Sequence, residues 1–215
     1  YYAGLTIKDL AINKAAAANI YRADIQPVPG SGPIRGVVFY KDDAYAFRDN
    51  AGATACEIYK TTPMGWSKVN LGQTLNFSAM AVAPSAEGVT LTKGTTTAKI
   101  DRWVITSGDL TAGTASGYFV ISNVVNGPFT DGAATYPGGS VTVDGPEVQI
   151  VIQPGGTYSF SLGNFTAYFD TERIYGADGV NDAFEFDGSV YAPLPVDMPY
   201  KPKYAQVHAN HLFLA

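Results

Sequence analysis

Cysteine, histidine and clustered positive charge are all scarce in this sequence. The chain of 215 residues contains a single cysteine, Cys56, and two histidines, His208 and His211. One cysteine cannot form an internal disulfide, and these residues lack the spacing of a zinc site. With 14 Lys and Arg against 19 Asp and Glu, the net charge is −5, and no basic cluster is present. Binding to nucleic-acid phosphates, which needs a concentrated cationic surface, is therefore not expected.

Long apolar runs are missing as well. None approaches the roughly 18–20 residues that cross a bilayer as a helix, and no signal peptide is visible. Charged residues make up only 15% of the chain and hydrophobic residues 46%, which favours a folded protein. The 23 Gly, 13 Pro and 14 Tyr favour strands and turns over helices. We therefore expect an all-β protein with no membrane-spanning segment.

A repeated pattern of short strands predicts the organisation of the chain. Residues 36–76 contain four apolar or aromatic runs separated by tight turns, as in one blade of a β-propeller. Residues 165–215 repeat this pattern: 167–177 and 205–215 resemble 38–48, 183–186 resembles 55–59, and 189–194 resembles 66–71. The spacing of about 40 residues between the last two repeats fits propeller blades. Residues 165–215 thus predict a second blade and the start of a third.

Between these repeats, residues 77–164 predict an inserted β domain. About six strands separated by Gly-containing turns would suffice for a small barrel or sandwich. Because the repeat resumes afterwards, the two ends of the insertion should lie close together. The predicted fold class is therefore all-β, with partial β-propeller-like blades interrupted by an inserted small β-barrel or sandwich domain.

The two ends of the chain predict an arm and an open sheet. Residues 1–35 form an N-terminal arm and a Pro/Gly linker, in which Leu5, Ile7, Leu10 and Ile12 alternate like a strand, whereas residues 14–18 favour a helix. The last run, residues 211–215, ends without a closing turn. Since folded proteins pair or cover such edges, we expect this sheet to continue in residues outside this chain or in another subunit.

No catalytic residues, cofactor site or metal site are predicted. There is no Gly-x-Ser-x-Gly elbow, and His208 and His211 are interpreted as flanking a turn or contacting a subunit, with a shared metal as the alternative. Cys56 is interpreted as a small buried residue in a strand. We therefore do not expect an enzyme.

Two acidic patterns have functional and structural interpretations. Residues 178–182 (DGVND) resemble part of a calcium loop but lack the later glutamate, so an Asx-stabilised connection is favoured. Glu57 and Glu185 could form a carboxylate pair like that of glycoside hydrolases. Their equivalent positions in the repeat indicate a structural role instead.

Four aromatic residues lie near Gly/Pro loops: Tyr118, Phe129, Tyr136 and Tyr200. Exposed aromatic rings could bind a sugar or a host surface, whereas packing in the core is the alternative use of the same side chains.

A family resemblance rests on several stretches. YRADIQPVPG (21–30), GVVFYKDDAYAFR (36–48), RIYGADGVNDAFEFDG (173–188) and KYAQVHANHLFLA (203–215) resemble the propeller-bearing tail hub, nozzle or tail-accessory proteins of short-tailed bacteriophages. The stretch TAGTASGYFVISNVVNGPFTDG (111–132) resembles small β modules of phage structural proteins. The resemblance covers about half the chain and transfers no active site.

The resemblance implies a structural component of a phage virion, in the tail hub, the nozzle or the head-to-tail connection. Such a homo-oligomer would form a symmetric ring around the DNA passage, in contact with copies of itself and with neighbouring tail or connector proteins. DNA would pass without specific binding. The alternative is a carbohydrate- or cell-surface-binding β module, such as a receptor-binding tail component. A hydrolase using Glu57, Glu185 or His211 is a third possibility.

Overall fold

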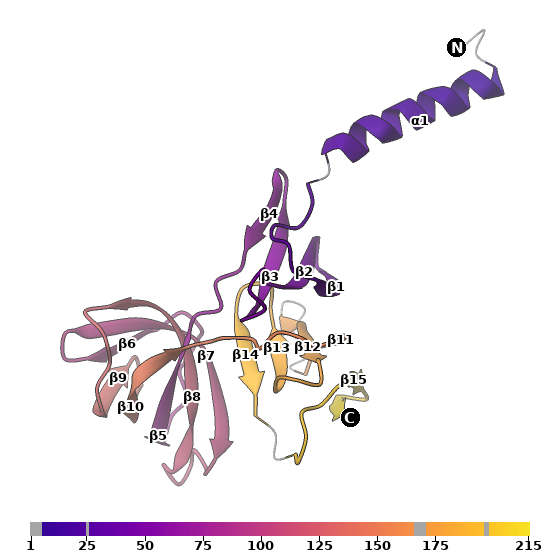
Figure 1. Ribbon diagram of the computed structural model, residues 1–215. Helices are drawn as coiled ribbons and strands as arrows, with labels where there is room; N and C mark the ends of the chain where they lie inside the picture. The colour runs from indigo at the N-terminus through magenta and orange to yellow at the C-terminus, as the bar shows by residue number, and fades with distance from the viewer. Residues whose placement is uncertain (1–5, 25, 166–170, 196–197) are drawn as a thin grey trace.

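A computed structural model describes residues 6–24, 26–165, 171–195 and 198–215. Its strands form two four-stranded antiparallel sheets, a closed six-stranded barrel and a two-stranded hairpin, and one helix lies near the N-terminus (Figure 1). The predicted fold class, all-β with an inserted small β domain, is confirmed. The inserted domain is a barrel and not a sandwich.

The first sheet contains all four strands that the sequence predicted. They are β1 (Ile34–Tyr40), β2 (Asp43–Asp49), β3 (Cys56–Thr62) and β4 (Gly65–Lys68), and they pair in that order. The β1–β2 turn is only two residues long, and Lys41 has a φ of 51° there. A polar residue in this left-handed conformation is typical of tight hairpins.

The second sheet repeats this order with β11 (Ser159–Gly163), β12 (Arg173–Ala177), β13 (Ala183–Phe186) and β14 (Tyr191–Leu194). β13 and β14 occupy the third and fourth positions, as their predicted similarity to β3 and β4 requires. The first strand, however, is β11, which lies inside the predicted 77–164 insertion. Residues 167–170 of the strand–turn–strand repeat predicted at 167–177 lie outside the described residues.

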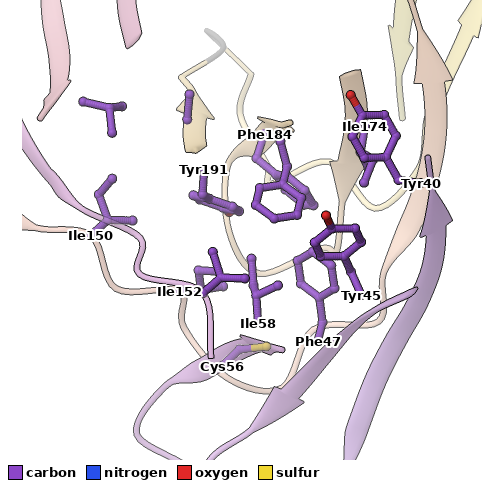
Figure 2. Packing of buried hydrophobic residues seen from close by; sticks show 14 of the residues in the cluster. Tyr40, Tyr45, Phe47, Cys56, Ile58, Ile150, Ile152, Ile174, Phe184 and Tyr191 are labelled. Carbon is purple, nitrogen blue, oxygen red and sulfur yellow. The ribbon is translucent and has the colours of Figure 1, made fainter. Parts of the chain in front are cut away.

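The two sheets pack face to face through aromatic rings. The Phe47 ring of the first sheet lies 5.7 Å from the Phe184 ring and 6.4 Å from the Phe186 ring of the second, measured between centroids. Tyr158 and Phe160 lie against the same ring at 4.5 and 5.1 Å. Figure 2 shows this cluster between the two sheets. Aromatic packing therefore joins strands that are more than 100 residues apart in the sequence.

The barrel closes in the strand order β10-β5-β8-β7-β6-β9. Its strands are β5 (Gln73–Met80), β6 (Thr90–Lys93), β7 (Thr96–Ser107), β8 (Ala115–Val125), β9 (Gly132–Tyr136) and β10 (Gly139–Gln149). A separate apolar core, centred on Leu75, Ile100 and Phe119, fills it. The Ile150 amide donates to the Gly72 carbonyl at 3.2 Å, so the segments before and after the barrel lie side by side.

The barrel is therefore shorter at its C-terminal end than the predicted insertion. It runs from Gln73 to Gln149, and β11 belongs to the neighbouring sheet. The difference has a local cause, since Pro154, Gly155 and Gly156 interrupt the strands between the barrel and β11. β11 then joins the sheet whose aromatic core accepts Phe160.

A hairpin of β15 (Ala205–His208) and β16 (His211–Leu214) lies against the second sheet, near β11 and β12. The Val207 amide donates to Ser161 Oγ at 2.9 Å. A β-carbon at Gly163 of β11 would lie 2.9 Å from Val207, and one at Gly36 of β1 would lie 2.7 Å from the Tyr158 β-carbon. Glycine thus permits a close approach both where the first sheet meets the second and where the second meets the hairpin.

The N-terminal arm is the helix α1 (Ile7–Asp24), which stands away from the body (Figure 1). Its first turn is capped reciprocally: the Thr6 amide donates to the Asp9 carboxylate at 3.0 Å, and the Asp9 amide donates to Thr6 Oγ1 at 3.2 Å. The alternative of a strand over residues 5–12 is wrong for the described part, because this cap and the following alanines favour a helix. Leu5 lies outside the described residues.

The linker after the helix is held on the first sheet. Trp66 Nε1 donates to the Gln26 carbonyl at 2.9 Å, and Arg48 donates to the carbonyls of Val28 and Gly32. The arm therefore leaves the body from a fixed point near β4.

The aromatic core gives a matched test of stability. We expect Phe47→Ala to lower the free energy of unfolding by about 3–5 kcal/mol, because it leaves a cavity among four rings. Phe39→Ala, on the neighbouring strand but with 75% of the side chain exposed, should cost at most about 1 kcal/mol. Urea denaturation followed by circular dichroism measures both. Equal losses would contradict the assignment of Phe47 to the central core.

Candidate functional site

The two histidines lie on the hairpin turn, as predicted. His208 and His211 are cross-strand partners, both are exposed, and Nδ1 of His211 lies 2.8 Å from the Ala209 carbonyl oxygen. Among the described residues, no group of three or more His, Cys, Asp or Glu could hold a metal ion. Since zinc sites use three or four protein ligands, this pair would need ligands from another molecule.

Cys56 is buried at the start of β3, as the sequence indicated. Burial raises the pKa of its thiol to about 12. A thiol that stays protonated is a poor nucleophile, so Cys56 is a packing residue.

The acidic loop at residues 178–182 is an Asx-stabilised connection, the interpretation that the sequence favoured. Asp178 is buried, and its Oδ1 accepts hydrogen bonds from the amides of Val180 and Asn181 at 2.9 and 2.7 Å. Asn181 Nδ2 donates to the other oxygen at 2.7 Å. These three local hydrogen bonds engage both oxygens of the carboxylate and stabilise the turn.

Glu57 and Glu185 each take part in an ion pair. Glu57 accepts from Lys68 Nζ at 2.7 Å and from the Tyr59 hydroxyl at 2.6 Å, and these bonds hold its pKa below the usual value. Burial, together with the neighbouring Glu57 carboxylate, raises the pKa of Tyr59 to about 12. Glu185 lies 2.8 Å from Arg102. Both glutamates have structural partners, in agreement with the structural role that their repetition indicated.

Three of the four candidate binding aromatics are buried. Tyr118 donates its hydroxyl to the Pro193 carbonyl, Tyr136 donates to the Val82 carbonyl, and Phe129 lies in the barrel core. Only Tyr200 is exposed, with 59% of its surface accessible. A sugar or host surface could therefore meet Tyr200 but not the other three rings.

The sequence did not reveal an ion-pair network between the barrel and the second sheet. Arg102 of β7 lies 2.8 Å from Glu185, 2.6 Å from Asp187 and 3.0 Å from Glu87. Arg173 of β12 lies 3.6 Å from Glu87. The only local signal for this network is an Arg directly before the apolar run WVI (103–105). The network, with the Tyr118–Pro193 bond, fixes the barrel against the second sheet.

The candidate functional site is a groove of about 480 Å³ at the junction of the first sheet and the barrel. Eight apolar residues line it: Ala55, Cys56, Ile58, Val69, Leu71, Ile150, Val151 and Ile152. Polar residues add to its lining: Glu57, Lys68, Asn70 and Gln149. A mainly apolar concavity with a few polar groups is the usual form of a binding site.

Backbone bonding explains why the groove forms. The Cys56 amide donates to the Ile152 carbonyl and the Val69 amide donates to the Ile58 carbonyl, both at 2.8 Å. The two segments that connect the sheet to the barrel thus bond to β3 at neighbouring points and meet again at Gly72. Ile58, Ile150 and Ile152 belong to the central core as well (Figure 2), so the wall of the groove is rigid. No local sequence motif indicates the groove, because the segments that line it are far apart in the sequence.

A second exposed apolar surface lies on β1. Val37 has 50% and Phe39 has 75% of its surface accessible. Both side chains are on an edge strand of the first sheet, and folded proteins generally cover or interrupt exposed apolar edges.

No known protein family, curated protein or solved structure matches this chain. Within the described residues, no helix combines the length and apolar character that a bilayer crossing requires.

The Arg102 network can be tested by a matched pair of variants. Arg102→Ala should lower the free energy of unfolding by about 1–3 kcal/mol, because it removes the cation from the half-buried carboxylates of Glu185 and Asp187. Lys99→Ala, three positions earlier on β7, breaks only an exposed pair with Asp101 and should cost at most about 1 kcal/mol. Chemical denaturation measures both, and a small effect of Arg102→Ala would show that the network does not hold the barrel.

The Cys56 thiol should react only when the protein unfolds. At pH 8 we expect a disulfide reagent to label no thiol in the native protein and one thiol per chain in guanidinium chloride. Burial raises the pKa of the Cys56 thiol from 9.0 to about 12. The unfolded state therefore loses this proton first, and the free energy of unfolding falls as the pH rises from about 9 to about 12. Rapid labelling of the native protein would contradict the burial of Cys56.

Proposed function

We propose that this chain is a structural subunit of a tailed-phage virion, in the tail hub, the nozzle or the head-to-tail connection. In this role it assembles into a ring that forms part of the DNA passage. The observation that carries the proposal is that the stack of first sheet, second sheet and hairpin has exposed apolar side chains at both ends. Val37 and Phe39 lie at one end, and Phe213, 57% exposed, lies at the other.

The way in which the sheets follow one another supports propeller-like packing. The first sheet packs on the second by aromatic rings, and the hairpin packs on the second sheet's other side through Ser161 and Val207. The first strand of the first sheet, β1, lies against the first strand of the second sheet, β11, and β11 lies against the first strand of the hairpin, β15. Neighbouring blades of a propeller pack in the same way. The two ends of the stack have different surfaces, so one end of a copy can bind the opposite end of the next copy. Such head-to-tail contacts produce a ring when the rotation between neighbouring copies adds up to a full turn.

The barrel suits a contact module of fixed direction. Arg102 and Tyr118 tie it to the second sheet, and its two connecting segments tie it to the first. A rigidly held module can touch an adjacent subunit or tail protein in one orientation. The net charge of −5 suits a wall along which DNA slides without binding, and a basic lumen in the assembled ring would refute this assignment.

A carbohydrate- or cell-surface-binding module is the second candidate. The observation that favours it is the pair Tyr200 and Tyr204, which expose 59% and 58% of their surfaces close together in sequence. Exposed tyrosines supply large amphipathic contact surfaces for ligands.

Assembly is tested on the full chain by native mass spectrometry and negative-stain electron microscopy. We expect a closed oligomer of one stoichiometry, which Phe39→Glu weakens at least about tenfold in dissociation constant because it places a charge in the contact. Met64→Glu, at a turn position that is 94% exposed, is the control and should leave assembly unchanged. A monomer at all concentrations, with glycan-array binding lost in Tyr200→Ala, would support the second candidate instead.

A further inference from the structure

In the described part of the chain, an exposed N-terminal helix and an open, mainly apolar groove are both present. We propose that the helix α1 of one copy binds in the groove of a second copy, with Ile7 and Leu10 as the anchoring side chains. This inference rests on the proposed function, because it assigns one of the contacts that build the ring.

The helix needs a partner. It has 18 residues, and most of the stability of helices in proteins comes from packing one face against another surface. Apart from Asp9, every described side chain of α1 is exposed, including 89% of Ile7 and 49% of Leu10. The reciprocal cap at Thr6 nevertheless gives the helix a defined first turn, and apolar side chains exposed there can contribute to association only if another surface covers them.

Ile7 and Leu10 have the spacing of helix-in-groove anchors. Residues three apart lie on the same face of a helix, and Ala11, Lys14 and Ala18 continue that face. The groove, at about 480 Å³, has a volume typical of sites that hold apolar groups, and six aliphatic residues line it. Its polar lining, which includes the Lys68–Glu57 pair, offers partners to Lys8 and Asp9 beside the anchors.

The position of the arm points to a second copy as the occupant. The linker is fixed to the first sheet through Gln26 and Trp66, and from there α1 points away from the body (Figure 1). At 1.5 Å per residue, the helix carries Ile7 about 25 Å from its anchored end. The helix contains three cationic and two acidic residues, whereas the whole chain carries a net charge of −5.

One arm and one groove per chain make a head-to-tail contact. Each copy would give its arm to one neighbour and accept an arm from the other, which closes a ring without leaving either feature unfilled. The groove adjoins the first sheet and both connections to the barrel, so the bound arm would contact all three.

Cysteine cross-linking tests the contact on the full chain, because the native Cys56 is buried. A tagged Leu10→Cys variant is mixed with untagged Val151→Cys, whose position lines the groove and is 51% exposed. Under mild oxidation we expect an intermolecular disulfide between the two. Met64→Cys, exposed but outside the groove, should not cross-link to Leu10→Cys. If the Leu10→Cys/Val151→Cys double variant forms only an intramolecular disulfide, the arm folds onto its own groove and the proposal is overturned.

Charge variants separate this inference from the proposed function. Ile7→Asp/Leu10→Asp should raise the dissociation constant of the oligomer at least about tenfold in native mass spectrometry. Ala16→Asp, on the opposite face of α1, should leave the dissociation constant unchanged. Rings that persist in Ile7→Asp/Leu10→Asp would overturn arm exchange but leave the ring proposal standing. Absence of assembly by the wild-type chain, together with absence of a cross-link between Leu10→Cys and Val151→Cys, would overturn both.

Discussion

The packing of the Phe47 ring against the aromatic rings of the second sheet is the interaction on which the rest of the structure depends. It joins β2 to β11 and β13, which lie on the far side of an entire barrel in sequence. Because burial of aromatic surface is the largest single source of stability in such a core, the two sheets hold each other in place. The barrel is thereby confined to the loop between them.

The position of the barrel follows from this packing and from polar contacts at its base. Its two connecting segments meet at Gly72 and Ile150, and Arg102 pairs with carboxylates of β13 and the residue after it. The same crossing of segments opens the groove beside β3. The fold and the candidate site therefore have the same origin, because the groove lies where the two connecting segments join the first sheet to the inserted barrel.

Local signals in the sequence predicted the strands but not all of their partners. The runs around Val38, Phe47 and Ile58 were legible because Gly, Asp and Asn turns separate them. The helix was legible in part, through its alanines. The assignment of β11 failed, because the alternation of Ser with Tyr158 and Phe160 fits any half-buried strand. Its sheet is chosen by contact with Phe47, 113 positions earlier than Phe160 in the numbering.

The candidate site was beyond sequence reasoning for the same reason. Arg102 and Asp187 are 85 positions apart, and the groove is built from segments near residues 58, 70 and 150. The histidines, Cys56 and the acidic loop were interpreted correctly, because their roles depend on near neighbours along the chain or across one turn. The role of a residue that contacts its neighbours along the chain can be predicted from such a sequence. A surface formed by segments that are far apart in the sequence cannot.

In an assembly subunit of the proposed kind, the arm becomes ordered on a neighbour. Amide hydrogen exchange of residues 7–24, followed by mass spectrometry over a range of protein concentrations, tests this most directly. We predict rapid exchange of these amides in dilute protein and protection that rises with concentration, while exchange in β2 and β13 stays slow throughout. Protection of the helix that does not change with concentration would contradict the exchange of arms between copies.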